Sequence, residues 1–366
     1  MVRRQMTRLA VAAAAAGTVC ALGASAAYAA PSSSWAGPSG PVPGAITNST
    51  PSLSSVSFPG SIGSGTIVAW RTRGNVGHIK FRFKTATFNK GHWSKVGEVP
   101  GASAITTNPP VIRSYTDPFG HSAVVVFWSG HLDHHIWWEQ GETKSDGSIS
   151  WTSAAVLPKN VQFDNTTSGP TALFTNKAFL VLLAWRGPAN HDRYATGQPS
   201  GRGFKWSNSH IIPGPPVTSN CKNAPCTGNT PALAEQQTST SSGTIYYFWR
   251  QSSTKAIMYA TTADTFANLT SGKTSWTAPV QVPGAATILA PAASDSTTAG
   301  FGPLLLAYKA VSNTNVRFQT FDNGTWSAAA RIPTTHTTVA PDLWVNRLAT
   351  TTPGTDGNVV LHTFTP

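Results

Sequence analysis

A short run of apolar residues that ends in an aromatic side chain recurs at intervals of about 60 residues along the chain. The runs occupy residues 66–70, 124–128, 180–185, 245–249 and 304–308, and residues 359–362 form a sixth, less regular copy. Continuous apolar runs of this length are typical of strands buried on both faces. Segments that alternate apolar and polar residues follow the first five runs, at residues 78–83, 136–139, 193–195, 257–260 and 316–321. The alternation predicts a further, half-buried strand in each unit.

Tryptophan and proline mark two more positions of the same repeat. Six tryptophans are each followed by a proline seven or eight residues later: Trp35/Pro43, Trp93/Pro100, Trp151/Pro158, Trp206/Pro213, Trp276/Pro283 and Trp326/Pro333. After each pair, a stretch rich in Gly, Thr and Asn ends at another proline: Pro51, Pro110, Pro170, Pro231, Pro291 and Pro341. Each unit therefore predicts four strands, which are one after the second proline, the apolar run, the alternating strand and a strand led by tryptophan.

Four-stranded units repeated in this way are typical of propeller blades, and we expect an all-β fold, a six-bladed β-propeller of four-stranded blades. Five units are complete from Pro51 onward, whereas the sixth, from Pro341, shows two strands before the chain ends. We expect residues 35–38 to supply its missing strand. Pairing of this N-terminal strand with the C-terminal blade would close the ring and leave no exposed sheet edge.

The first 30 residues predict a secretory signal peptide. Arg3, Arg4 and Arg8 precede an apolar stretch at residues 9–22, and residues 27–30 are a small-residue cleavage site. We therefore expect a secreted protein whose single propeller domain spans residues 31–366. A retained membrane anchor is the alternative, but the apolar stretch is short and rich in Ala and Gly. No later segment predicts a membrane span.

Composition narrows the class further. Only 11% of the residues are charged, while 13 are tryptophan, and this combination excludes a disordered chain. Most tryptophans occupy equivalent repeat positions, so we interpret them as core residues. Cys221 and Cys226 are separated by four residues in a loop beyond the leader, and in an exported protein we expect them to form a local disulfide.

Turns with Asp or Asn beside Gly precede several of the tryptophan-led strands. Examples are Asn89-Lys-Gly91-His-Trp93, Asp146-Gly147-Ser-Ile-Ser-Trp151 and Asp322-Asn-Gly324-Thr-Trp326. These residues suit hairpin turns with positive φ. Here the chain resembles the Asp-box, or BNR-type, repeats of sialidase-like propellers and the related propeller lectins. No copy reproduces the full Ser-x-Asp-x-Gly-x-Thr-Trp order, and in that family the box is a structural turn. The resemblance implies the fold more than an activity.

Polar residues gather in the loops that follow the apolar runs. In a propeller these loops and the blade-to-blade connections open on the same face, where convergent polar groups can form a ligand site. Arginine forks and carboxylates match sugar hydroxyls or acid groups through paired hydrogen bonds. The predicted ligand-binding residues are Arg71, His131, Asp133, His134, Arg186, His191, Asp192, Arg193 and Arg250. The alternative is that the arginines, which recur at one repeat position, serve contacts between blades.

Neither a metal site nor a catalytic centre is marked in the sequence. Residues 131–135 contain histidines and an aspartate, which are zinc ligands, but no second ligand set is identifiable, so we predict no metal and no cofactor. Glycoside hydrolysis usually requires two carboxylates flanking the bond, and no pair is marked by spacing. The sequence thus favours binding over catalysis without deciding between them.

The net charge of +12 suggests an anionic partner. The basic residues are spread along the chain, and export makes nucleic acid a poor partner, so we expect an extracellular or cell-surface glycan. The predicted function is a secreted, lectin-like carbohydrate-binding propeller, with a protein partner if it serves as the targeting subunit of a larger assembly. The alternatives are a glycoside hydrolase or polysaccharide lyase on the same fold, and a protein-interaction propeller.

Overall fold

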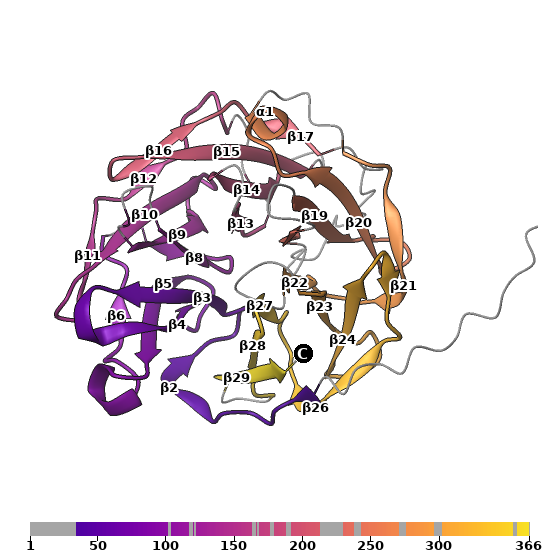
Figure 1. Ribbon diagram of the computed structural model, residues 1–366, viewed down its shortest axis with the longest axis horizontal. Coiled ribbons are helices and arrows are strands. Elements are labelled where there is room, and N and C mark those ends of the chain that lie inside the picture. Colours follow the sequence, from indigo (N-terminus) through magenta and orange to yellow (C-terminus); the bar gives the residue numbers. More distant parts are fainter. Residues whose placement is uncertain are drawn as a thin grey trace, which may run out of the picture. The chain divides into compact units, whose positions relative to one another are not determined.

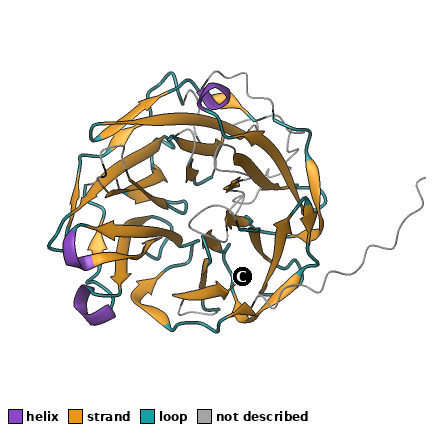
Figure 2. Cartoon of the chain, in the orientation of Figure 1, coloured by secondary structure: helices purple, strands orange, loops and turns teal. Residues whose placement is uncertain are grey.

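Six antiparallel sheets are arranged around a central axis in the computed structural model (Figure 1). The structure describes residues 34–101, 104–116, 120, 122–162, 166, 168–175, 179–187, 192–212, 230–237, 243–270, 276–295, 302–353 and 357–365. Nearly all of the regular structure is strand, as Figure 2 shows. The described helices are the single turns η1 (Gly60–Ile62) and η2 (Phe88–Gly91) and the short α1 (Phe266–Thr270).

Each sheet is one blade, numbered here in chain order from the first complete unit. Blade 1 contains β3 (Ser52–Phe58), β4 (Gly63–Arg71), β5 (Gly77–Thr85), β6 (Gly97–Glu98) and β7 (Ile105–Thr106). Blade 2 contains β8 (Val111–Thr116), β9 (Ser122–Ser129), β10 (Ile136–Thr143), β11 (Ile149–Trp151) and β12 (Ala155–Val156). Blade 3 contains β13 (Thr171–Phe174), β14 (Val181–Arg186), β15 (Asp192–Ser200), β16 (Gly203–Trp206) and β17 (His210–Ile211).

The second half of the ring follows the same order. Blade 4 contains β18 (Ala232–Gln237), β19 (Gly243–Arg250), β20 (Ala256–Ala263) and β21 (Val280–Ala286). Blade 5 contains β22 (Ala292–Asp295), β23 (Leu304–Lys309), β24 (Asn315–Asp322), β25 (Thr325–Trp326) and β26 (Ala330–His336). Blade 6 contains β27 (Asp342–Trp344), β28 (Arg347–Thr351) and β29 (Asn358–Thr365), completed by β1 (Ser34–Trp35) and β2 (Pro41–Ile46) from the other end of the chain.

The predicted six-bladed fold and its closure are confirmed. Strand β1 pairs with β29, so that Ser34 lies opposite Thr365 and Trp35 opposite Phe364. The innermost strands contact one another in ring order, from β3 through β8, β13, β18, β22 and β27 back to β3. In Figure 1 the indigo β2 lies beside the yellow β29, which shows the N-terminal segment completing the C-terminal blade.

The sixth apolar run is the one strand whose position in its blade was predicted wrongly. Residues 359–362 lie in β29, the third strand of blade 6, rather than in the second. The second strand is β28, whose sequence Arg-Leu-Ala-Thr-Thr has no aromatic end. Thr350 and Thr351 are buried in it nevertheless, and Thr350 meets His362 of β29 through its hydroxyl. Only two apolar residues, Leu348 and Ala349, are buried beside these threonines, so the strand leaves no continuous apolar run in the sequence.

The second-strand aromatics form the core between blades. Trp70 packs with Ala349, Val359 and Leu361 of blade 6, so it faces the blade that precedes it in the ring. The corresponding aromatics face the preceding blade in the same way: Trp128, Trp185, Trp249 and Tyr308. All five are at most 4% exposed. The prediction that these recurring aromatics are core residues is confirmed.

Turn geometry also follows the sequence. Asn323 and Gly324 adopt positive φ values of 48° and 79° in the hairpin between β24 and β25. Gly147 has φ of 84°, and the Asp146 carboxylate accepts hydrogen bonds from the backbone N–H and the hydroxyl of Ser148. Residues that tolerate the left-handed region therefore set these hairpins, as expected.

Candidate functional site

A basic residue ends the second strand in four of the six blades. These residues are Arg71, Arg186, Arg250 and Lys309, each directly after the core aromatic. Arg71, Arg186 and Lys309 are buried, and Arg250 is half-buried. Burial lowers the pKa of Arg71, of Arg250 and of Lys309, because it penalises the charged form. Cations held in this way at one end of the strands form a recurrent polar layer above the aromatic core.

Blades 3 and 4 bring three of the predicted residues together. Arg186 at the end of β14 lies opposite Asp192 at the start of β15, and its Nε donates to Asp192 Oδ1 at 3.3 Å. Across the blade boundary, the positive charge of Arg186 adds to burial in lowering the pKa of Arg250. Tyr247 of β19 completes the group, since burial and the Asp192 carboxylate raise its pKa well above the ordinary value. We call Arg186, Asp192, Arg250 and Tyr247 the blade 3/4 cluster.

The blade 3/4 cluster has the chemistry of a ligand site. Two guanidinium groups accompany one carboxylate, so the cluster carries both donors and an acceptor in a setting of low exposure. Hydrogen bonds to charged groups in such surroundings are stronger than those in water. The fold places Arg186, Asp192 and Arg250 at the strand ends where the second and third strands connect, whereas Tyr247 lies inside β19.

Arg71 belongs to a different arrangement. Its Nη1 donates to the Gly74 carbonyl at 2.7 Å and its Nη2 to Asn48 Oδ1 at 2.8 Å. Both partners are loop residues of the protein itself. The guanidinium therefore fixes the loop after β4 to the connection that enters blade 1, in agreement with the alternative reading of the arginines as structural.

The loop of blade 2 is held by its own aspartate. Asp133 Oδ1 accepts from the His135 backbone N–H at 3.1 Å, and Oδ2 accepts from Trp137 Nε1 at 2.9 Å. His134 has φ of 53°, and its carbonyl accepts the Thr166 N–H at 2.9 Å. His131 follows the isolated bridge between Thr106 and Gly130. His131, Asp133 and His134 thus form a compact turn of blade 2, and no group of three or more His, Cys, Asp and Glu suited to a metal occurs among the residues that the structure describes.

Arg193 does not belong to the blade 3/4 cluster. Arg193 is paired with Trp185, so it occupies the sheet face opposite that of the paired Arg186 and Asp192. His191, Cys221 and Cys226 lie outside the described residues. The ligand and disulfide predictions for these three positions therefore stay predictions.

A recurrent threonine, missed in the sequence analysis, shapes the connections between blades. It stands four residues before each proline of the second series: Thr47, Thr106, Thr166, Thr227, Thr287 and Thr337. In every copy that is described, the hydroxyl accepts a backbone N–H two residues later, at 3.0 to 3.3 Å. The signal was available as the spacing Thr-x-x-x-Pro. The threonine hydroxyl positions the residues beside the strand ends. One of them is Asn48, which accepts a hydrogen bond from Arg71.

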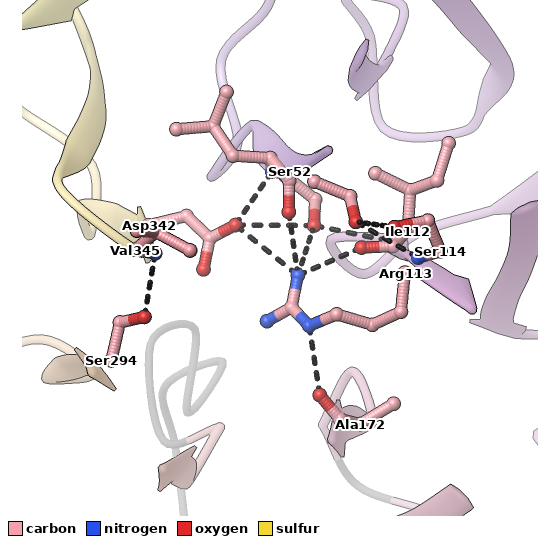
Figure 3. A network of polar contacts seen from close by, with 10 residues as sticks. Ser52, Ile112, Arg113, Ser114, Ala172, Ser294, Asp342 and Val345 are labelled. Atoms are coloured by element: carbon pink, nitrogen blue, oxygen red, sulfur yellow. Dashed lines mark hydrogen bonds and ion pairs between the residues drawn. The ribbon is translucent and has the colours of Figure 1, made fainter. Parts of the chain in front are cut away.

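An ionic network at the ring centre was missed as well (Figure 3). Arg113 of β8 donates from Nε to the Ala172 carbonyl of blade 3 and from Nη1 to the Leu53 carbonyl of blade 1, each at 2.8 Å. Its Nη1 lies 3.6 Å from Asp342 Oδ2 of blade 6, which in turn accepts the Leu53 N–H at 2.7 Å. Arg113 and Asp342 together connect four blades and, with the six prolines of the second series, line a narrow central cavity.

Glu139 is a buried acid away from the polar layer. It is 1% exposed on β10, and burial raises its pKa to about 7. Its Oε2 has no hydrogen-bond partner in the described part of the chain. Glu139 is paired with Val126, which packs between blades 1 and 2, so this acid is not part of the blade 3/4 cluster.

Comparison with known proteins defines the class through structure alone. No protein-family model matches the chain, and no curated protein matches it in sequence. A triple arginine-to-alanine mutant of AofleA from Arthrobotrys oligospora is similar in fold, with a TM-score of 0.55 and 14% identity over 87% of this chain and 80% of that one. A Penicillium chrysogenum α-L-arabinanase complexed with arabinobiose gives a TM-score of 0.53 and 11% identity over 90% and 96%.

A fungal lectin described as a six-bladed β-propeller with a fucose recognition mode, from Aleuria aurantia, gives a TM-score of 0.50 and 14% identity over 79% of this chain and 80% of that one. At such identities the likeness shows the fold. The chain is a six-bladed β-propeller similar in architecture to propeller lectins and to arabinan-degrading propellers. The comparisons do not confirm the resemblance to sialidase-like, Asp-box repeats. In the described residues, no helix has the length and apolar character that crossing a membrane would need.

Proposed function

We propose that the protein is a secreted carbohydrate-binding propeller whose site is the blade 3/4 cluster. The observation that carries the proposal is the Arg186–Asp192 pair at the strand ends of blade 3, together with Arg250 of blade 4, which lies close enough for the charge of Arg186 to lower its pKa. Guanidinium groups donate paired hydrogen bonds and a carboxylate accepts them, which is the pattern needed to hold neighbouring sugar hydroxyls. Preorganisation by burial and by the Arg186–Asp192 pair lowers the cost of ordering the site on binding.

The similar structures support the ligand class. Their printed descriptions name fucose recognition for one propeller and arabinobiose for another, so carbohydrate ligands occur on both the binding and the enzymatic versions of this architecture. The Asp/Asn-Gly turns before the tryptophan-led strands support a relationship to Asp-box propellers as part of the same proposal. The proposed site requires no cofactor.

A glycan array tests the proposal, with variants chosen to separate binding from folding. Arg250→Gln keeps a polar side chain at a half-buried position, and we expect it to abolish binding to the glycans that the unaltered protein retains while leaving the melting temperature unchanged. Arg202→Ala is the matched control. Arg202 lies in blade 3, as Arg186 does, but it pairs with Glu142 on the exposed outer edge of the ring. Arg186→Ala is unsuitable alone, since it leaves Asp192 buried without its cation.

The enzymatic alternative is tested on the same hits. Each bound glycan is incubated with the protein and the mixture analysed for shortened or unsaturated products. Binding without product supports the proposal, product formation replaces it with a hydrolase or lyase, and failure to bind any glycan favours the protein-interaction alternative.

Export is the remaining part of the proposal. The arginines at positions 3, 4 and 8 and the apolar stretch after them support it. N-terminal sequencing of the protein recovered from culture medium should give a chain that begins at Pro31. Recovery of the full-length chain in the membrane fraction would contradict cleavage and release, and it would indicate the retained anchor. A larger species in native mass measurements of the exported protein would support a role as a targeting subunit.

A further inference from the structure

Basic residues line one face of β5 in blade 1. His78, Lys80, Arg82 and Lys84 alternate with Ile79, Phe81, Phe83 and Thr85, so the four basic side chains share one face of the strand while the apolar ones pack toward blade 2. Consecutive residues on one face of a strand are about 6.7 Å apart, which makes a line of basic side chains about 20 Å long. We call these four residues the β5 stripe.

The β5 stripe lies on the side of blade 1 that meets blade 6. Arg82 is paired with Val68 and Lys80 with Trp70, and both partners pack against blade 6. Thr66, the partner of Lys84, accepts a hydrogen bond from Arg347 Nη1 of blade 6. Arg347 thereby extends the line of positive charge across the blade boundary.

Little negative charge offsets the stripe. Glu98 of β6 lies 3.0 Å from His78 Nδ1 and 3.5 Å from Lys80 Nζ. Within the described ranges, Arg82 and Lys84 have no acidic partner. No other third strand holds more than one Lys or Arg, as the sequences of β10, β15, β20, β24 and β29 show. The stripe is therefore a property of blade 1 and not of the repeat.

An aromatic ring stands beside the cations. The Ser94 N–H donates to the Phe83 carbonyl, which places the preceding residue, Trp93, next to Lys84 along the outer edge of β5. Trp93 is half-buried and packs on the same cluster as Val68 and Trp70, so it lies on the face of the stripe. A ring with one exposed part next to a row of cations suits a ligand that has both an apolar sugar face and acid groups.

We propose that the β5 stripe, with Arg347 and Trp93, is a second binding surface, for a linear anionic polysaccharide. A row of cations with low-dielectric walls concentrates polyanions, and its extended geometry fits a chain rather than a single sugar. Binding of single-stranded nucleic acid instead uses successive aromatic side chains, one for each stacked base, and only Trp93 accompanies this stripe among the described residues. The surface belongs to blades 1 and 6 and does not depend on the blade 3/4 cluster.

Polygalacturonate is the probe, and its fully methyl-esterified form is the uncharged counterpart of the same backbone. The double variant Arg82→Gln/Lys84→Gln removes two stripe cations. Lys159→Gln/Lys205→Gln removes two exposed cations from blades 2 and 3 and is the matched control. We expect the stripe variant to bind polygalacturonate about tenfold more weakly at low salt and the control to bind within about twofold of the unaltered protein. Affinity should fall with salt less steeply for the stripe variant, since fewer ions are released.

Four outcomes would overturn the proposal. They are equal losses in the two double variants, equal binding of the methyl ester, tighter binding of single-stranded DNA of matched charge, and loss of polymer binding in Arg250→Gln. The last outcome would assign the polymer to the blade 3/4 cluster. Conversely, a glycan array without hits would contradict the proposed function while leaving the polygalacturonate result standing. Equal melting temperatures of the two double variants show that folding is not the cause.

Discussion

Trp35, near the start of the described chain, lies directly opposite Phe364 near its end, and their ring centroids are 5.2 Å apart. The indole also meets Phe318 of blade 5 edge-on at 5.7 Å. This single side chain therefore joins the N-terminal strand, the C-terminal strand and the neighbouring blade. The ring is closed by side-chain packing as well as by the backbone ladder.

Replacing Trp35 should weaken closure. Trp35→Ala removes a buried indole from between Phe318 and Phe364, and we expect it to lower the free energy of unfolding by about 3 kcal/mol. Trp35→Phe, which keeps an aromatic ring there, should lose less than half as much. Chemical denaturation followed by far-UV circular dichroism measures both. Equal stability of all three proteins would show that closure does not depend on this contact.

Loss of the last strands should unfold the whole ring. A chain that stops before Leu343 lacks β28 and β29 and leaves both β1 and the blade 6 face of Trp70 without partners. We expect rapid proteolysis throughout the chain and no cooperative thermal transition. A protease-resistant product with an intact transition would contradict a ring that must close.

The central ion pair should contribute strongly to stability. Asp342→Ala leaves the buried Arg113 without its carboxylate and the Leu53 N–H without its acceptor. Removing one partner of a buried pair is costly, and we expect a loss of about 3 kcal/mol in the free energy of unfolding. Asp322→Ala, at an exposed hairpin, is the control and should change it by less than about 0.5 kcal/mol. Similar losses for the two variants would contradict the role of the central network.

Glu139 should make the fold less stable as pH rises. Its pKa is about 7 in the folded protein, against an ordinary value of 4.5, because burial favours the neutral form. The folded state thus binds this proton more tightly than the unfolded state, and the associated stability is lost between pH 4.5 and pH 7. Glu139→Gln should be more stable than the unaltered protein by about 3 kcal/mol at pH 8, with the difference vanishing near pH 4.5. Parallel pH profiles in denaturant titrations would contradict this.

His362 should make the fold less stable at acidic pH. Burial lowers its pKa to about 4 from 6.5, and its two ring nitrogens lie 3.4 Å from the hydroxyls of Thr335 and Thr350. Because the folded protein holds the neutral imidazole, stability is lost as pH falls from 6.5 toward 4. His362→Gln should flatten this part of the profile in thermal melts, at some cost at neutral pH. An unchanged acid limb would show that another group is responsible.

The sequence predicts the parts of the fold that repeat. The apolar runs before Trp70, Trp128 and Trp185 are second strands, as predicted, because the same burial recurs in blades 1 to 5, and Gly324 marks a hairpin because few other residues adopt its φ. Strand β28 escaped detection because its buried positions are shared between two apolar residues, Leu348 and Ala349, and two threonines, which leaves no continuous apolar run.

In the same way, only the polar residues that stand at a repeat position could be predicted from the sequence. Arg186 and Arg250 stand out at one repeat position, and register then places Asp192 opposite Arg186. Arg113 and Asp342 carry no such signal, since they lie far apart in the chain and each occurs in one blade alone. A contact between residues that each occur in one blade alone can be recognised only from the three-dimensional structure.

The packing of each second-strand aromatic on the preceding blade distinguishes Trp70 from its counterparts. Trp128, Trp185 and Trp249 are each covered by the blade that precedes their own along the chain. Trp70 is covered by blade 6, which is built from both ends of the chain. A protein whose only fluorescent tryptophan is Trp70 would therefore signal the closing of the ring, and not the formation of the blade that carries it.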